Sequence, residues 1–167
     1  QEFDTIAFRN ALGSFTTGVT IITATAPDGT PVGLTANSFN SVSLEPPMVL
    51  WSLAKTSLSL DAFNEAIHWN VHVLSQDQQD LSNTFASRGE NKFQGIALDK
   101  GISDAPLIPN CSARFQCKNI VTHDGGDHLI YIGEVLSFDQ QTLPPLVFQQ
   151  GQYAMTARKP WEGVALS

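Results

Sequence analysis

The sequence is poor in positive charge, in cysteine and in long apolar runs. It has 9 Lys and Arg against 16 Asp and Glu, which gives its 167 residues a net charge of −7. A surface of this sign repels nucleic acid and anionic lipid, so we expect neither as a partner. The two cysteines, Cys111 and Cys117, form no Cys-x-x-Cys pair. With no leader-like N-terminus and no apolar run of membrane-spanning length, we expect a reduced, soluble, cytoplasmic protein.

Two common nucleotide-binding motifs are also missing. No Gly-x-Gly-x-x-Gly follows an expected strand and no Gly-x-x-x-x-Gly-Lys-Ser/Thr occurs, which excludes the Rossmann and P-loop modes of phosphate binding. His68 and His72 have the spacing of a zinc-binding helix, but the residues between them lack its glutamate and are typical of a strand. We therefore predict no metal site and interpret the two histidines as an edge or surface pair.

The distribution of apolar residues predicts one mainly β domain. Hydrophobic residues make up 42% of the chain, enough for one covered core, and we assign 1–155 to this domain and 156–167 to a C-terminal tail or linker. Helices are expected after Asp4, over 60–67 and after a capping box at Ser75 and Gln78, with a long loop over 87–110. Strands are predicted over 19–24, 32–36, 48–53, 69–74, 113–121, 128–138 and 146–148. This spacing favours a closed β-barrel with helices packed outside.

Small polar residues follow the second expected strand. The segment consists of Thr35, Ala36, Asn37 and Ser38, and it is continued by Ser41, Val42 and Ser43. Such residues offer hydroxyl, amide and backbone N–H groups with little bulk, as the edge of a buried flat ring requires. The same side chains also satisfy ordinary turns, so the residues alone leave both interpretations open.

A second candidate segment joins an expected strand to the next helix. It consists of Ser52, Leu53, Ala54, Lys55, Thr56, Ser57, Leu58 and Ser59. Its cation, its hydroxyls and the N–H groups at a helix start favour a bound phosphate. An ordinary serine cap beside a solvated lysine explains the same pattern. A small basic patch of Arg88, Lys92 and Phe93 follows the third helix, and it either approaches a phosphate or is simply solvated.

Two residues late in the chain are further candidates. His128 begins a long strand beside flexible glycines, and a histidine there can supply a hydrogen bond or a cation near neutral pH. Tyr153 follows the turn at Gly151. A lone histidine at a strand end is more often structural, and the convergence of His128 and Tyr153 on one site is a hypothesis.

The order of these segments resembles the flavin reductase family, the small NAD(P)H:flavin oxidoreductases of two-component monooxygenases. The resemblance runs from about Phe8 to Tyr153 and includes Gly133, Glu134 and Val135. It implies an FMN-binding split β-barrel with a few peripheral helices, usually a homodimer that holds flavin near the subunit interface. Two departures are that His72 stands where Asn is common, and that loop 87–93 keeps only its closing basic and aromatic pair.

The resemblance also implies roles for the candidate residues. Segments 35–38 and 41–43 would face the isoalloxazine and the ribityl chain, and segment 52–59 would hold the phosphate. Lys92 and Phe93 would belong to the cofactor site, with Tyr153 and the catalytic His128 near the nicotinamide.

The implied activity is reduction of FMN or FAD by NADH or NADPH, with the reduced flavin passed to a partner oxygenase. Hydride transfer between two aligned rings needs no nucleophile or strong base, which agrees with a sequence that shows no triad. The alternatives are a non-catalytic flavin-binding or storage protein, and an enzyme of the pyridoxamine-phosphate-oxidase type. The residues leave open the flavin, the nicotinamide, the partner oxygenase and whether a further domain follows Ser167.

Overall fold

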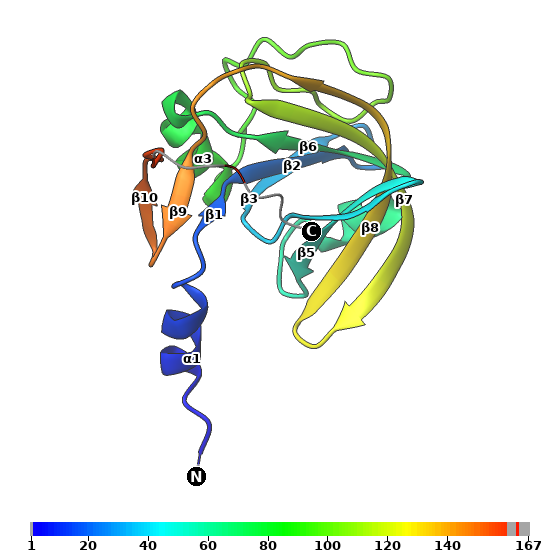
Figure 1. Cartoon of the computed structure of the whole chain (residues 1–167). Coiled ribbons are helices and arrows are strands. Elements are labelled where there is room, and N and C mark those ends of the chain that lie inside the picture. Colours follow the sequence, from blue (N-terminus) through cyan, green and yellow to red (C-terminus); the bar gives the residue numbers. More distant parts are fainter. Residues whose placement is uncertain (1, 160–162, 164–167) are drawn as a thin grey trace.

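The protein is described by a computed structural model that covers residues 2–159 and residue 163. Most of the predicted tail, namely 160–162 and 164–167, lies outside the described residues. A central antiparallel sheet, a second small sheet and a few short helices make up the fold (Figure 1).

The central sheet has seven strands in the order β3-β2-β6-β7-β8-β5-β4. The strands are β2 (Thr20–Thr25), β3 (Pro31–Ala36), β4 (Asn40–Leu44), β5 (Pro47–Ala54), β6 (His68–Val73), β7 (Ala113–Gly125) and β8 (His128–Gln140). The small sheet has the order β1-β9-β10, and its strands are β1 (Thr17–Gly18), β9 (Val147–Gln149) and β10 (Gln152–Ala154). The predicted strands are therefore present, and the sequence missed β1, β4 and β10.

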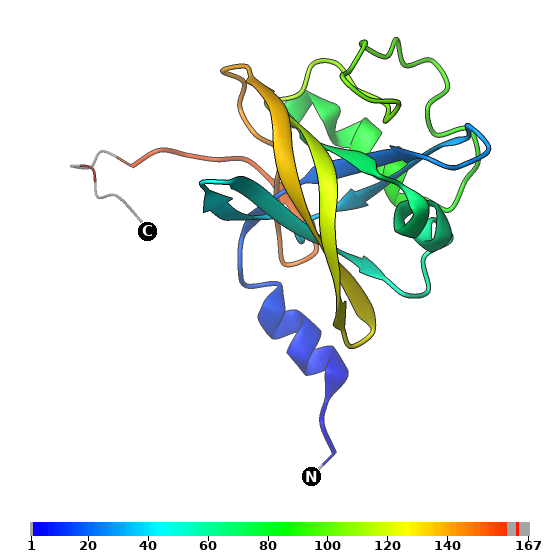
Figure 2. The same ribbon diagram turned by 90° about the vertical axis from the view of Figure 1, so that its right-hand side faces the viewer.

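The expectation of a closed barrel is wrong, because the edge strands β3 and β4 do not pair with each other among the described residues. At the turn after β3, the hydroxyl of Ser38 accepts from the Ser52 N–H at 2.9 Å and donates to the Ser52 carbonyl at 3.2 Å. These bonds tie the turn after β3 to β5, and the chain then continues as β4, which pairs with the edge of β5 that faces away from β8. The sheet curls, and Figure 2 shows the long β7–β8 hairpin running across the body.

The helices begin close to the expected residues but are short. α1 (Thr5–Leu12) follows Asp4, whose carboxylate accepts from the N–H groups of Ile6 and Ala7, both at 3.0 Å. α2 (Leu60–Glu65) ends before Ile67, which is exposed. The capping box of Ser75 and Gln78 is present, but it opens a 3-10 turn, η1 (Gln76–Gln78), ahead of α3 (Gln79–Ala86).

The core is aromatic on the inner face of the sheet. Trp51 stacks on Tyr131 at 4.8 Å and contacts Trp69 edge-on at 5.9 Å, and all three are fully buried. On β5 every second side chain, including Val49 and Leu53, enters this core. The run 48–53 is therefore not buried throughout, and its alternate side chains face outward.

His72 is not a surface residue, as the sequence suggested, but is completely buried on β6. Its Nδ1 lies 2.9 Å from the carbonyl oxygen of Ile21, and its Nε2 accepts from the Ile108 N–H at 3.0 Å. Nδ1 therefore carries the proton and the ring is neutral. Burial lowers the pKa of His72 to about 4. Within the described part of the chain no cluster of His, Cys, Asp or Glu could hold a metal ion, and no helix could cross a membrane.

Candidate functional site

A cavity of about 940 Å³ opens beside the edge strand β3. Its walls are the outer side of β3, the C-terminal end of α3, the loop that follows α3, and the segment between β5 and α2. The lining includes Thr30, Pro31, Gly33, Thr35, Ser57, Ser59, Phe85, Ser87, Arg88, Glu90, Asn91, Lys92 and Phe93. Its volume lies within the range of about 300–1,000 Å³ that is usual for small-molecule sites.

The cavity unites five of the residues that the sequence predicted, namely Thr35, Ser57, Ser59, Lys92 and Phe93. The Ser57 hydroxyl accepts from the Ser59 N–H at 3.2 Å, so this segment already forms a tight turn before α2. Ser59 begins α2 but makes no side-chain cap bond, which leaves its hydroxyl available. The Thr35 hydroxyl, in contrast, donates to the Ser82 carbonyl at 2.7 Å and joins β3 to α3.

Gly33 allows α3 and its loop to approach β3 closely. A Cβ at Gly33 would lie 2.7 Å from Phe85 Cε1 and 3.2 Å from Phe93 Cζ, so a larger residue there would force both rings away. The two rings contact each other edge-on at 4.9 Å. This role of Gly33 was not predicted from the sequence, in which the one available signal is its place two residues before the predicted segment that begins at Thr35.

Two cations lie at the cavity in different settings. The Lys92 ammonium donates to the Gly33 carbonyl at 3.2 Å and to the Phe85 carbonyl at 3.1 Å, and burial lowers its pKa. Arg88 lines the cavity, is exposed, and has no acceptor among the residues that the structure describes. In a chain of net charge −7, these two cations outnumber the one acidic residue of the lining, Glu90, so the cavity suits an anionic ligand.

A second group of predicted residues lies on the outer face of β5 and β8. Ser52 pairs with Ile130, and Ala54 pairs with His128, while the alternate residue Leu53 is buried in the core. The outer face therefore presents Ser52, Ala54 and His128, whereas the Leu53 side chain points away from it. The His128 Nδ1 lies 2.7 Å from the Asp127 carboxylate, and this hydrogen bond lowers the pKa of Asp127.

Lys55 connects this face to the tip of the β7–β8 hairpin. Its ammonium forms an exposed ion pair with Asp124, whose pKa it lowers through the hydrogen bond. Its backbone N–H donates to the Asp127 carbonyl at 2.9 Å. Lys55 therefore fastens the start of the 55–59 segment to the hairpin, and its charge is already paired.

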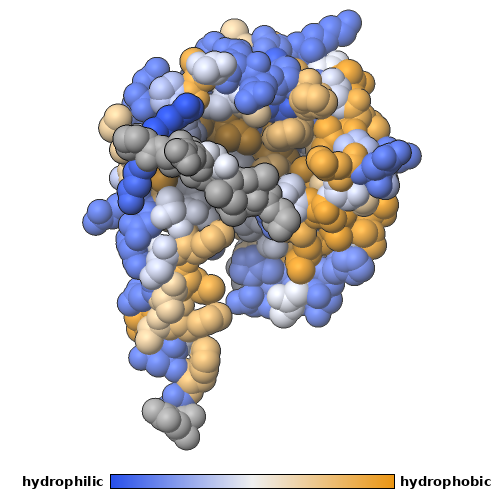
Figure 3. Space-filling view, viewed as in Figure 1, coloured by the Kyte–Doolittle hydropathy of each residue, from blue (hydrophilic) through white to orange (hydrophobic). Residues whose placement is uncertain are grey.

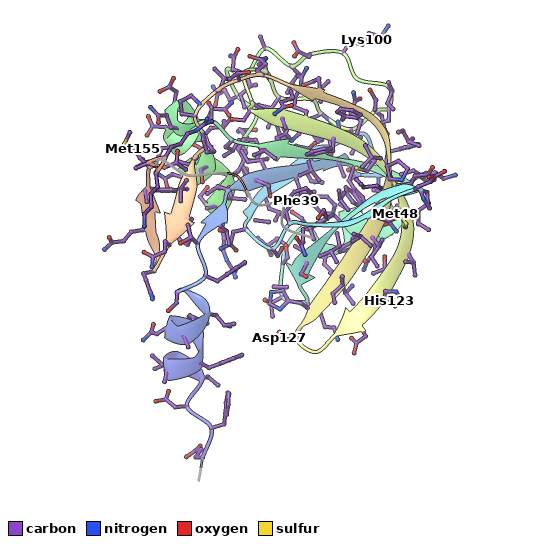
Figure 4. The ribbon with its side chains drawn as sticks, in the orientation of Figure 1. Phe39, Met48, Lys100, His123, Asp127 and Met155 are labelled. Carbon is purple, nitrogen blue, oxygen red and sulfur yellow. The ribbon has the colours of Figure 1, made fainter. Side chains whose placement is uncertain are left out.

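The other predicted residues lie outside the cavity. Ser41 and Val42 are exposed on the edge strand β4, where the register with β5 shifts between Ser41 and Ser43. Ala36 ends β3, Asn37 is exposed in the following turn, and Ser38 is bonded to β5 as described above. This turn leads from β3 to β4 at the edge of β5, and its last residue, Phe39, which is labelled at the centre of Figure 4, packs against the core.

Tyr153 and His128 lie in separate parts of the molecule. The Tyr153 hydroxyl lies 2.7 Å from the Ser82 hydroxyl and donates to the Asn83 side-chain oxygen at 2.8 Å, so it is bound to α3. His128 is at the hairpin tip, and Figure 4 shows its neighbour Asp127 far from Met155, which follows β10. Their hypothesised convergence does not occur within this chain.

Comparisons with known proteins agree on one family. Residues 12–157 match the model of the flavin reductase like domain. The chain is 48% identical over 153 residues to the FMN reductase (NADH) SmoA of Agrobacterium fabrum, covering 92% of this chain and 87% of that protein. It is 42% identical to the reductase component of the flavin-dependent trigonelline monooxygenase of Acinetobacter baylyi, covering 90% of this chain but only 48% of that protein. This chain thus spans about half the length of the Acinetobacter relative.

A solved structure shows the same fold. The NADH:FAD oxidoreductase of Streptomyces globisporus superposes with a TM-score of 0.87 at 32% identity, covering 98% of this chain and 96% of that protein.

Proposed function

This chain belongs to the flavin reductase family, and we propose that it is an NADH-dependent flavin reductase that supplies reduced flavin to a partner monooxygenase. The observation that carries the proposal is the 48% identity to an FMN reductase (NADH) over 92% of the chain. A second relative is named as the reductase component of a monooxygenase, which supports the transfer of reduced flavin to a separate oxygenase.

The cavity beside β3 has the donors that a flavin phosphate requires. Arg88 has no protein acceptor among the described residues, and the hydroxyls of Ser57 and Ser59 line the same cavity. We place the phosphate at this wall and the ring system along the turn 37–39 toward Ser52 and Ser43. When bound, the flavin accepts a hydride from the nicotinamide. The residues of this chain bind and orient the two ligands and exclude water.

The titratable groups of the chain agree with this supporting role. Burial raises the pKa of Cys111 to about 11 and that of Cys117 to about 12, so neither is a thiolate nucleophile at neutral pH. His72 is neutral and fully bonded in the core. We assign to His128, on the outer face of β5 and β8, the role of contacting the nicotinamide.

We further propose that the protein is a cytoplasmic homodimer with a split β-barrel fold, in which the split is the opening between β3 and β4. Support for the dimer comes from α1, which projects from the body and contains no buried residue (Figures 1 and 3). Ile6 on α1 is 73% exposed, and Phe15, which follows the end of α1, is 80% exposed. Contiguous exposed apolar surface of this kind marks an interaction site. We keep 1–155 as one domain, followed by a tail.

The proposal is tested by following NADH oxidation at its near-ultraviolet absorbance band with FMN, FAD or riboflavin, and with NADPH in place of NADH. We expect NADH consumption that depends on added flavin and yields reduced flavin usable by an oxygenase. A protein that binds flavin but leaves NADH unoxidised would instead be a flavin-binding or storage module. The flavin arms decide between FMN and FAD, and the nicotinamide arms decide between NADH and NADPH.

A further inference from the structure

Lys92 and Arg88 are four residues apart in the loop after α3 and both line the cavity. We propose that Lys92 is a positioning residue: its ammonium ties β3 to the end of α3 and thereby holds the 88–94 loop over the cavity. Arg88 is then the cation that is available to the anionic group of the ligand. The inference rests on the proposed function, in that the ligand is taken to be a flavin.

The two acceptors of Lys92 are carbonyls that regular structure leaves without partners. Gly33 is on β3, the edge strand of the central sheet, where backbone groups on the outer side have no neighbouring strand. Phe85 is in the last turn of α3, where the carbonyls have no intrahelical donor. A cation at a helix C-terminus is also stabilised by the helix dipole. Lys92 therefore satisfies both elements at once.

Apolar packing around Gly33 also holds the 88–94 loop in place, in addition to the hydrogen bonds of Lys92. The Phe93 ring, next to Lys92 in the chain, seats against Phe85 at 4.9 Å and against the open side of Gly33. The polar and the apolar contacts of the loop thus converge on one residue of β3. Because two of the three N–H donors of the ammonium are hydrogen-bonded to carbonyls, the protein fixes the position of the Lys92 side chain before any ligand binds.

Arg88 has the opposite character. It is exposed, it lines the cavity, and no described residue offers it an acceptor. A guanidinium binds phosphate oxygens through two parallel hydrogen bonds and suits this role better than a committed ammonium. The loop that Lys92 and Phe93 anchor is the same loop that carries Arg88, so loss of the anchor displaces Arg88 together with the cavity wall.

The test compares two flavins that differ in the phosphate. Dissociation constants of FMN and of riboflavin are measured by flavin fluorescence for the whole chain and for the matched variants Lys92→Met and Arg88→Met. We expect Lys92→Met to weaken both flavins by the same factor, about tenfold, because it moves the wall that both contact. Arg88→Met should weaken FMN about tenfold and leave riboflavin unchanged. Lys92→Arg, which keeps the charge and the donors, should recover most of the affinity.

A second readout does not depend on flavin. Hydrogen exchange of the 88–94 amides should accelerate in Lys92→Met and remain as in the unmodified chain in Arg88→Met. If Lys92→Met weakens FMN while riboflavin binding and loop exchange stay unchanged, Lys92 is a phosphate ligand and the inference is wrong. If Lys92→Met fails to fold, Gly33→Ala replaces it as the test, since it displaces Phe85 and Phe93 with Lys92 intact. This variant should weaken the binding of both flavins equally. An effect on FMN alone would contradict the proposed positioning role of Lys92 and its loop. If the unmodified chain binds no flavin, the proposed function is wrong. The hydrogen-exchange experiment still tests whether Lys92 holds the 88–94 loop in place.

Discussion

Ala54 and His128 are register partners in the ladder between β5 and β8, which places the His128 imidazole on the outer face of the sheet beside the start of the 55–59 segment. The same segment reaches the cavity through Ser57 and Ser59. His128 is thus connected to the cavity wall through one short stretch of chain, although it does not line the cavity itself. Its hydrogen bond to Asp127 fixes the orientation of the ring.

Replacing His128 by alanine should impair the use of NADH more than the binding of flavin. We expect the KM for NADH to rise about tenfold, since one hydrogen bond to a ligand is lost, while the dissociation constant of the flavin changes less than twofold. Steady-state kinetics and flavin fluorescence measure the two quantities. His123→Ala is the matched control, because this second exposed hairpin histidine has no assigned role. Unchanged NADH kinetics in His128→Ala would remove His128 from the site.

Replacing Tyr153 by phenylalanine tests whether this residue contacts ligand or only supports α3. Its hydroxyl is bonded to Ser82 and Asn83, and the Ser82 carbonyl in turn accepts from Thr35 at the cavity. We expect a loss of about 1 kcal/mol in the free energy of unfolding, measured with urea. For a supporting residue, FMN and NADH constants should change by less than threefold. A large rise in the KM for NADH alone would instead return Tyr153 to the nicotinamide site.

The sequence predicted the parts of the fold that depend on local patterns. Asp4 caps α1, the Gly126 turn joins β7 and β8, and the alternating run before Leu74 forms β6. It could not predict that the sheet stays open, because local patterns do not determine whether the two edge strands, β3 and β4, pair with each other. Nor could the sequence show that His72 is buried, since its four-residue spacing from His68 is the same whether the side chain is buried or exposed.

The sequence predicted those parts of the candidate site in which neighbouring residues share hydroxyl, cationic or aromatic side chains. Thr35, Ser57, Ser59, Lys92 and Phe93 do come together at one cavity. What the sequence could not supply is which polar atoms are already used. Lys92 donates to two carbonyls, while Arg88, which the sequence grouped with Lys92 in one basic patch, has its guanidinium available among the described residues. Such a distinction depends on distances between elements remote in the chain.

The buried His72 should make the protein less stable in mild acid. Its pKa is about 4 in the folded state against 6.5 for the free side chain, so between these values the unfolded chain binds more protons. Stability is therefore complete above about pH 6.5 and is lost as the pH falls toward 4. We expect the free energy of unfolding to fall by about 2 kcal/mol from this group between pH 7.5 and pH 5.

Urea denaturation at the two pH values measures this loss, and His72→Asn is the control that removes the titration. The pH dependence should shrink in that variant even if its stability at pH 7.5 is lower, because the buried ring bonds of His72 are lost as well. The imidazole resonances of His72 should not titrate in the folded protein between pH 8 and pH 5.5. A measured pKa near 6.5 would contradict the neutral, fully bonded ring.

If the protein is the homodimer that we propose, the exposed apolar face of α1 should hold its subunits together, and removing this face should dissociate them. An isolated helix of 8 residues is marginal in water, so α1 needs a surface to pack against. The outer sheet face offers one, since Leu50 and Ile132 pair on it, and Leu44 nearby is 94% exposed. A standard interface buries about 800 Å² per partner, and an aromatic side chain alone contributes about 150–250 Å².

Leu12→Ser combined with Phe15→Ser should therefore convert a dimer into a monomer in sedimentation velocity at micromolar concentration. Leu98→Ser is the control, because it removes an exposed leucine from the loop on another part of the surface. If the outer face of β5 and β8 is buried between subunits, the monomer should also lose NADH oxidation, since His128 lies on that face. A chain that is monomeric without any substitution, yet reduces flavin at full rate, would show that one subunit completes the site and that α1 serves another partner.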